Sequence, residues 1–248
     1  MSQIALNLFT VRDFIKSRSA IRKTLQRLKK IGYDHVQIGS LSYLGAKEFR
    51  QLLDDFGMTC CARHVGLFQS ETDALKSIEE HQILGCQFSA ISHMRADSAA
   101  GYVELAGRAD KWARLFKKHG LTLAYHNHAH EFQKFDGQLA LDIIFENSTT
   151  LQSEIDTYWV HYGGGVTCDW IEKMKNRLPL IHLKDYAIVD GQPTFAEVGE
   201  GNLNFPKILD AAKAAGTRWF IVEQDICARD PFDSVKISLE NLKKMGMD

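Results

Sequence analysis

The chain has 248 residues, of which 45% are hydrophobic and 25% are charged, as expected of a globular protein with one large core. Thirty basic residues stand against 31 acidic ones, and the net charge of −1 argues against a nucleic-acid-binding protein or one held at an anionic membrane surface. No apolar run reaches the length of about 18 residues that a membrane span needs, and polar residues interrupt the N-terminal segment, so we expect neither a transmembrane helix nor a secretory signal.

A short β-rich segment followed by a helical pattern recurs along the chain at intervals of roughly 25 to 35 residues. The predicted strands cover residues 3–9, 34–38, 58–64, 87–92, 121–127, 151–156, 179–183 and 218–224. The predicted helices cover residues 19–31, 45–56, 71–84, 99–118, 138–147, 167–176, 204–215 and 230–242. Alternation of this kind implies a parallel sheet with right-handed crossovers, and eight such units close into a barrel.

The alternative fold is an open doubly wound sheet, which would need a glycine-rich phosphate-binding turn after an early strand. Neither G-x-G-x-x-G nor G-x-x-x-x-G-K-[ST] occurs, and we interpret the GGG of residues 163–165 as a flexible loop. We also find no Pro/Ser-rich linker and no low-complexity segment. The predicted fold is therefore α/β, a single (β/α)8 TIM barrel that occupies residues 1–248 as one domain.

The cysteines indicate a reducing environment. They are odd in number and none forms a C-x-x-C pair, which is typical of reduced, mostly buried thiols rather than of a disulfide framework or a zinc knuckle. The five are Cys60, Cys61, Cys86, Cys168 and Cys227. We therefore expect a cytoplasmic protein.

Reactive side chains gather at the C-terminal ends of the predicted strands, where a barrel of this type holds its active site. The third, fifth, sixth, seventh and eighth strands end in or near His64, His126, His128, Glu131, Glu154, Asp156, His182, Lys184, Asp185, Glu223 and Asp225. The opposite strand ends carry Thr122, Leu151, Pro179 and Arg218, which are far less reactive as a set. We expect Glu154 to support the site or to fill a barrel layer, and Asp185 and Asp225 to orient other groups or to cap helices.

Three carboxylates and one imidazole from four consecutive strand ends suit a divalent metal ion. The predicted ligands are Glu131, Asp156, His182 and Glu223, although His126 or His128 could take the place of Glu131. This oxygen-rich set favours Mn²⁺, with Mg²⁺, Co²⁺ or Zn²⁺ as alternatives. Such an ion would polarise the carbonyl of a chelating substrate, and a nearby carboxylate could then move a proton between carbons through an enediolate.

Five segments resemble the xylose isomerase-like TIM-barrel superfamily and, within it, the sugar phosphate isomerase/epimerase group with its inosose dehydratase-like relatives. They are YHNHAHEF at 125–132, EIDTYWV at 154–160, PLIHLKD at 179–185, EVGEGNLNFPKIL at 197–209 and FIVEQD at 220–225. The resemblance implies four metal ligands, a Glu, an Asp, a His and a Glu, from the ends of strands five to eight. The last three match Asp156, His182 and Glu223.

The first family ligand is less direct, because members with an ENH-type sequence have Glu where this chain has His126. We place it at Glu131, five residues later. The first and last Glu also form the acid/base pair of the family's epimerases, which implies that Glu131 and Glu223 are catalytic. The resemblance further implies substrate contacts for His64 and Lys184, and we assign His126 and His128 to substrate binding or proton handling.

Two departures concern substrate binding. Gln37 stands where many members have Glu, and HYGGGVT at 161–167 replaces an AGGDP-like pattern. The endonuclease IV branch of the fold is separated from this chain by its additional set of histidine ligands, a set that we do not expect here.

These features predict a divalent-metal-dependent isomerase or epimerase of a sugar or keto-sugar. The alternative is a lyase that dehydrates an inosose-like or 3-keto sugar, with His126 or His128 as the acid that helps a hydroxyl leave. An abasic-site endonuclease and a non-catalytic sugar-binding barrel rank below these. The expected partner is a small sugar or polyol-derived ketone, with no nucleic acid and no membrane. The aromatics Trp159, Tyr162 and Trp170, which we expect to be exposed, could contact a sugar ring or a second subunit in a homo-oligomer.

Overall fold

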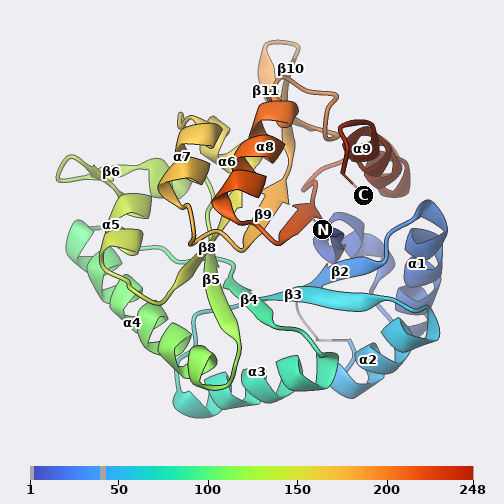
Figure 1. Ribbon diagram of the computed structural model, residues 1–248, viewed down its shortest axis with the longest axis horizontal. Coiled ribbons are helices and arrows are strands. Elements are labelled where there is room, and N and C mark those ends of the chain that lie inside the picture. The colour runs from blue at the N-terminus through green and yellow to red at the C-terminus, as the bar shows by residue number, and fades with distance from the viewer. Residues whose placement is uncertain (1–2, 40–42, 248) are drawn as a thin grey trace.

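Eight parallel strands form a closed barrel in the computed structural model, which describes residues 3–39 and 43–247 (Figure 1). Around the barrel the order is β1-β12-β9-β8-β5-β4-β3-β2, and β1 pairs with β12 to close it. The strands are β1 (Gln3–Asn7), β2 (His35–Ile38), β3 (Thr59–Val65), β4 (Phe88–Ile91), β5 (Thr122–His126), β8 (Gln152–Asp156), β9 (Leu180–Leu183) and β12 (Trp219–Val222). The predicted (β/α)8 barrel is confirmed.

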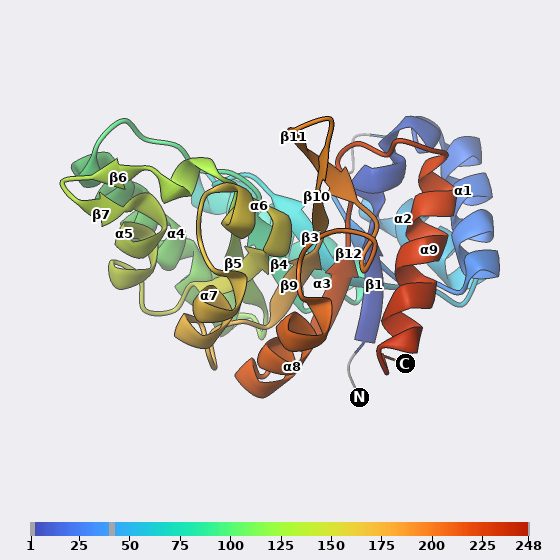
Figure 2. The ribbon, with the colours of Figure 1, turned by 90° about the horizontal axis from the view of Figure 1, so that it is seen from above.

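Helices surround the barrel, as two perpendicular views show (Figures 1 and 2). They are α1 (Arg18–Ile31), α2 (Ala46–Asp55), α3 (Glu71–Leu84), α4 (Ala99–Lys118), α5 (Ala140–Glu146), α6 (Thr157–Tyr162), α7 (Thr167–Lys173), α8 (Phe205–Ala215) and α9 (Pro231–Lys244), with the short 3-10 helices η1 (Leu8–Phe14) and η2 (His130–Phe132). Serine caps start three of them, because the side chains of Ser17, Ser70 and Ser98 each accept a hydrogen bond from a backbone N–H three residues on. None of the described helices is both long and apolar enough to cross a bilayer.

Two antiparallel hairpins outside the barrel were not predicted. They are β6 (Lys134–Phe135) with β7 (Gln138–Leu139), and β10 (Asp185–Val189) with β11 (Gln192–Ala196). Each turns at an Asp-Gly pair with positive φ at both residues, 51° and 85° at Asp136-Gly137 and 52° and 75° at Asp190-Gly191. Asp-Gly between apolar runs is a strong hairpin signal, so the sequence did contain this information.

The interior of the barrel is divided between apolar and polar side chains. Towards the strand beginnings it is filled by a small apolar cluster that includes Phe88, Leu180 and Trp219. Towards the C-terminal strand ends the buried side chains are polar, among them Gln37 and Glu154. An apolar layer therefore lies beneath the polar groups. The candidate site lies at the C-terminal end of the barrel, as the sequence indicated.

Two glycines of the GGG segment at 163–165 lie close to the ring of Phe132. A Cβ atom on Gly163 would lie 2.5 Å from the ring of Phe132, and one on Gly165 would lie 2.7 Å from the same ring. Gly164 has φ +84°, a conformation that favours glycine. Residues 163–165 form a loop between α6 and α7, as expected, and the glycines at its two ends let it approach Phe132 of η2.

Candidate active site

A cavity of about 910 Å³ opens at the C-terminal end of the barrel. Its lining includes His64, His93, His126, His128, Lys184 and Glu223. Of the eight predicted site residues, five therefore line this cavity. Asp156 and His182 lie beside it and are fully buried, whereas Glu131 does not line it.

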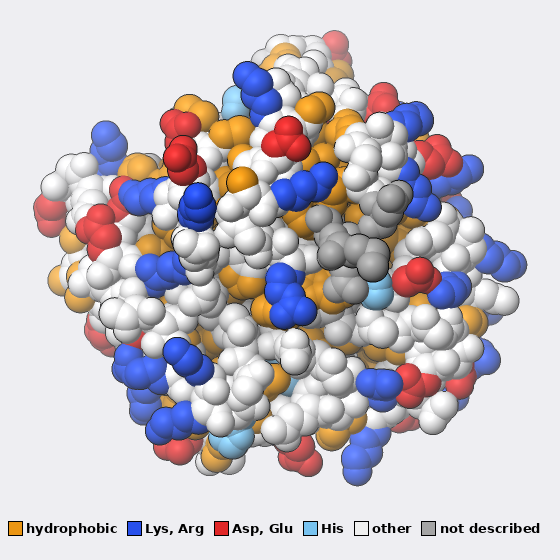
Figure 3. All heavy atoms as spheres, in the orientation of Figure 1, with side chains coloured by type: hydrophobic (Ala, Val, Ile, Leu, Met, Phe, Trp, Pro, Cys, Tyr) orange, Lys and Arg blue, Asp and Glu red, His pale blue; other side chains and the backbone are white. Residues whose placement is uncertain are grey.

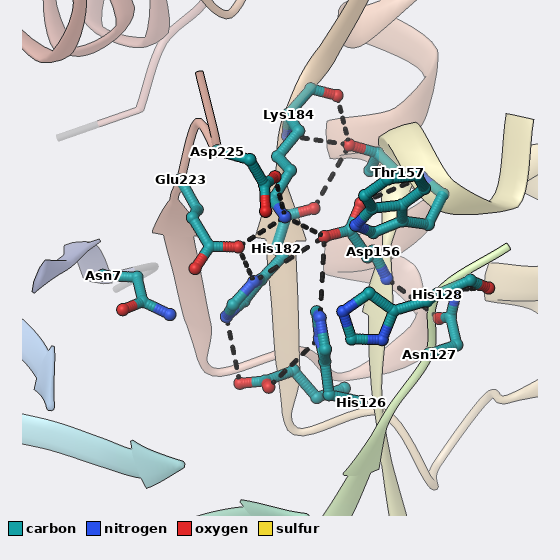
Figure 4. Close-up of polar contacts among 12 residues, drawn as sticks. Asn7, His126, Asn127, His128, Asp156, Thr157, His182, Lys184, Glu223 and Asp225 are labelled. Carbon is teal, nitrogen blue, oxygen red and sulfur yellow. Dashed lines mark hydrogen bonds and ion pairs between the residues drawn. The ribbon is translucent and has the colours of Figure 1, made fainter. Parts of the chain in front are cut away.

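Four buried side chains from consecutive strands meet at this cavity (Figure 4). His126 ends β5, Asp156 ends β8, His182 lies in β9 and Glu223 follows β12. One nitrogen or oxygen atom from each lies within 4.8 Å of the others. The parallel pairing of β8 with β9 sets Asp156 directly opposite His182, so the sheet register itself builds half of the cluster.

Glu154 lies beneath this cluster and faces both imidazoles. Its carboxylate oxygens lie 3.4 Å from Nδ1 of His126 and 3.4 Å from Nε2 of His182. The other ring nitrogen of each histidine faces the cluster, with Nε2 of His126 3.9 Å and Nδ1 of His182 3.7 Å from Oδ2 of Asp156. A carboxylate close to the ring nitrogen that does not bind the metal fixes the orientation of a metal-binding histidine. Glu154 lies in this position for both His126 and His182.

A buried chain of amides extends the support. Asn7 Nδ2 donates to Gln37 Oε1 at 2.8 Å, and Gln37 Nε2 donates to Glu154 Oε1 at 2.6 Å. Nε2 of His182 lies 2.6 Å from Gln37 Oε1, an acceptor, so this nitrogen carries a proton. Gln37, noted above as a departure from the family pattern, thus orients Glu154 and His182. Asn7 was missed because the first strand was predicted to continue to residue 9, whereas β1 ends at Asn7.

Charges of opposite sign balance one another in the cluster. Nζ of the buried Lys184 lies 3.0 Å from Asp156 Oδ2, 2.5 Å from Glu223 Oε2 and 2.7 Å from Asp225 Oδ2. Burial opposes the charge on Lys184, but these carboxylates hold its pKa above the usual value. Burial alone would also lower the pKa of His182, but Glu154 and Glu223 raise it to about 10. The protein thus keeps several charged groups in a closed space, which is typical of functional sites.

Glu131 is not brought into the cluster. It lies in η2, where its side chain accepts hydrogen bonds from the Tyr125 hydroxyl and, at 2.9 Å, from the backbone N–H of His128. His126 stands in its place, because it is the last residue of β5 and points into the barrel (Figure 4). The geometry thus places His126, the alternative named in the sequence analysis, in the four-residue cluster, and it leaves Glu131 outside both the cluster and the lining of the cavity.

The buried position of Glu131 predicts a pH effect on stability. Burial raises the pKa of Glu131 from 4.5 to about 7, against the hydrogen bonds from Tyr125 and His128. A carboxyl group whose pKa is raised on folding contributes stability that is complete below pH 4.5 and is lost as the pH rises through about 7. The loss is at most about 3 kcal/mol.

Glu131→Gln mimics the protonated form, so the variant should lose this decline in stability with rising pH. Urea unfolding at several pH values between 4.5 and 8 would measure the free energy of unfolding for both proteins. If the free energy of unfolding changes with pH in the same way for both proteins, Glu131 is not the source of the pH effect.

The three aromatic residues expected to be exposed differ in environment. Tyr162 is 50% exposed, whereas Trp170 is 7% exposed and packs edge-on against Phe132. The Trp159 ring lies 5.6 Å from His128 between ring centroids, beside the cavity. The expectation is confirmed for Tyr162 and corrected for Trp170, which is buried, and for Trp159, which is half-buried.

The side chains present fit a divalent metal ion. One nitrogen or oxygen atom from each of four buried side chains lies close to the other three, and Oδ2 of Asp156 has only the ion pair with Lys184, at 3.0 Å, as a close partner. Once Nδ1 of His182 has lost its proton, two imidazole nitrogens and two carboxylate oxygens form a mixed donor set that suits Mn²⁺, Co²⁺ or Zn²⁺ better than Mg²⁺. The oxygen-rich set expected from the sequence is thereby changed by one ligand.

The sequence model of the xylose isomerase-like TIM-barrel family matches residues 25–245 of this chain. The chain belongs to this family. A sugar phosphate isomerase/epimerase from Parabacteroides distasonis ATCC 8503 has a TM-score of 0.81 and 21% identity, covering 98% of this chain and 93% of its own. The recognition of this family from the five sequence segments is confirmed.

Two further solved structures share the barrel. An L-ribulose 3-epimerase has a TM-score of 0.75 and 15% identity over 99% of this chain and 94% of its own. The probable 3-DHS dehydratase AsbF, involved in petrobactin synthesis, from Bacillus anthracis, has a TM-score of 0.73 and 13% identity over 98% of this chain and 99% of its own. At these identities the likeness shows the fold alone. No curated protein gave a significant match.

Proposed function

We propose that this protein is a divalent-metal-dependent enzyme that isomerises or epimerises a small sugar or keto-sugar by proton transfer through an enediolate. The observation that carries the proposal is the buried cluster of His126, Asp156, His182 and Glu223 beside the 910 Å³ cavity. An ion held by these residues would supply a Lewis acid that polarises a substrate carbonyl. The cavity is large enough for a monosaccharide and is lined by hydroxyl-binding polar groups.

The roles that we assign to the residues follow from their positions. Glu223 is the carboxylate of the cluster that lines the cavity, and we propose that it moves the proton between substrate carbons. Lys184, 2.5 Å from Glu223 Oε2, would hold that carboxylate ionised and stabilise negative charge on a nearby substrate oxygen. His64 and His128, on the cavity wall, would bind substrate hydroxyls.

The family of this chain and the activities of solved proteins with the same fold support this choice of chemistry. An L-ribulose 3-epimerase and a sugar phosphate isomerase/epimerase are built on the same barrel. We further propose that the protein acts in the cytoplasm, which the five free cysteines support. On the face seen in Figure 3, basic and acidic side chains are interspersed among the described residues, which gives no support to nucleic-acid binding there.

One observation favours a lyase as the second candidate. A two-carboxylate epimerase needs an acid/base pair, yet only Glu223 of the expected pair lines the cavity, because Glu131 is turned towards Tyr125. From the sequence, we expected His126 or His128 to be the acid of a lyase. Because His126 lies in the four-residue cluster, His128, or His64 on the cavity wall, could instead protonate a leaving hydroxyl group once a proton has been taken from the neighbouring carbon. A dehydratase on the same barrel is consistent with this alternative.

Incubation of the metal-loaded protein with a panel of ketoses in deuterated water distinguishes the two reactions. An isomerase or epimerase should give a rearranged sugar that carries deuterium next to the carbonyl, whereas a lyase should give a product that has lost water. Mass spectrometry and NMR would detect both. Binding of a sugar without exchange or elimination across the panel would instead favour a non-catalytic barrel, and Glu223→Gln is the control that should show neither reaction.

A further inference from the structure

We propose that His93, His128 and His130 form a second metal site, separate from the four-residue cluster, that takes a transition-metal ion such as Zn²⁺. One ring nitrogen from each of these residues lies within 4.8 Å of the other two. The ring centroids are 4.7 Å apart for His93 and His130, and 5.9 Å apart for each of the other two pairs. The proposal makes His128 a metal ligand in addition to the wall residue of the proposed function, and the first of the two metal equivalents expected below rests on that proposed function.

The fold brings these three rings together from neighbouring strands. His93 follows β4, and His128 and His130 follow β5, which pairs with β4 in the barrel. The two loops leave the barrel side by side, so residues 35 or more positions apart in sequence meet above the strand ends. No additional set of histidine ligands was expected from the sequence, and this cluster of three histidines was not predicted.

The hydrogen bonds of His130 leave one ring nitrogen free for a metal ion. Its Nε2 lies 2.9 Å from the carbonyl oxygen of Met94, which can only accept, so Nε2 carries the proton. The lone pair is then on Nδ1. A carbonyl or carboxylate on the outer nitrogen is the usual partner of a metal-binding histidine, and Glu131 Oε1 lies 3.1 Å from the same Nε2.

The environment of His128 is a second indication of a metal site. Its Nδ1 is buried without a hydrogen-bond partner, and an unpaired buried polar atom costs free energy unless something binds it. The ring is held between His126 and Trp159, with centroids 4.9 Å and 5.6 Å away. Its backbone N–H donates to Glu131 Oε2, so Glu131 supports His128 and His130 together. This gives the acid of the YHNHAHEF segment a structural role.

The chemistry of the three ligands selects the ion. Three imidazoles without a carboxylate favour Zn²⁺, Cu²⁺, Ni²⁺ or Co²⁺ over Mg²⁺, which prefers oxygen ligands. Three protein ligands also leave a coordination position open. Because His93 and His128 line the same cavity as the four-residue cluster, that position would serve an oxygen of a bound molecule at the cavity wall.

Metal titration of protein stripped with a chelator tests the site. The unaltered protein should bind two Co²⁺ per chain, and the change in Co²⁺ absorption should report both equivalents. The double variant His93→Ala/His130→Ala should bind one Co²⁺, with affinity for the second equivalent weakened more than about 100-fold. Glu223→Gln, which alters the other cluster, should keep the second equivalent. His161→Gln, at an exposed histidine, is the matched control and should bind two.

Circular dichroism and thermal unfolding would show that each variant is folded before its stoichiometry is compared. The proposal is overturned if the double variant still binds two Co²⁺, or if the unaltered protein binds one that Glu223→Gln abolishes. The last result would leave the four-residue cluster as a metal site, so failure of the second site is distinguishable from failure of the first.

Discussion

Glu223→Gln should reduce turnover of the sugar substrate by roughly 10²- to 10⁴-fold, the range expected when a group that transfers a proton is lost. The same change should weaken Mn²⁺ binding. Oε2 of Glu223 lies 3.0 Å from Nδ1 of His182 and 2.5 Å from Nζ of Lys184, so it is a negative charge at the centre of the cluster. An amide has neither the charge nor the basicity of this carboxylate.

The measurement combines metal content with steady-state kinetics. Bound Mn²⁺ per chain and turnover would be determined for the unaltered protein, for Glu223→Gln and for Glu197→Gln. Glu197 is a suitable control because it is also a buried glutamate, but it is bonded to Ser234 outside the cavity. If Glu223→Gln keeps one tightly bound Mn²⁺ per chain and full turnover, both the ligand and the catalytic assignment of Glu223 are wrong.

His126→Ala should abolish Mn²⁺ binding at the four-residue cluster, whereas Glu131→Gln should retain it. His126 lies between Glu154 and Asp156, with its Nδ1 3.4 Å from the first carboxylate and its Nε2 3.9 Å from the second. Its loss would remove one of four ligands and leave Glu154 without one of its partners. We expect a decrease in Mn²⁺ affinity of more than about 100-fold, which exceeds the effect typical of an outer support residue.

Mn²⁺ is the appropriate ion for this comparison, because the three-histidine site should bind it weakly. Isothermal titration with Mn²⁺ on both variants would decide between the ligand indicated by the geometry and the one indicated by the family pattern. Tight Mn²⁺ binding by His126→Ala, together with its loss in Glu131→Gln, would restore Glu131 as the ligand.

The barrel itself was predictable from local signals. Strand segments recur between helical ones, Ser70 and similar residues cap helices, and Gly32 and Gly216 end them in the left-handed conformation. These signals act over a few residues and need no knowledge of the rest of the chain. The count of eight units then left the closed barrel as the natural arrangement.

Part of the candidate site was predictable from the alternation of side chains along a strand. Residues two apart on a strand point to the same side, so Glu154 and Asp156 were expected to share a face, and both do point into the barrel end. The position of a strand end was enough to predict that Asp156, His182 and Glu223 would lie near one another, and the structure brings them together. Within regular strands, sequence spacing therefore determined which side chains could meet.

Beyond the strand ends, only the tertiary structure decided the geometry. β5 ends at His126, and the path of the chain beyond it depends on side-chain contacts such as that of His130 with the distant Met94 and that of Glu131 with Tyr125. Neither the choice of His126 over Glu131 nor the meeting of His93 with its two partners can be read from spacing. The physical reason is that a loop has no repeating geometry, so its side-chain directions are set by whatever packs against it.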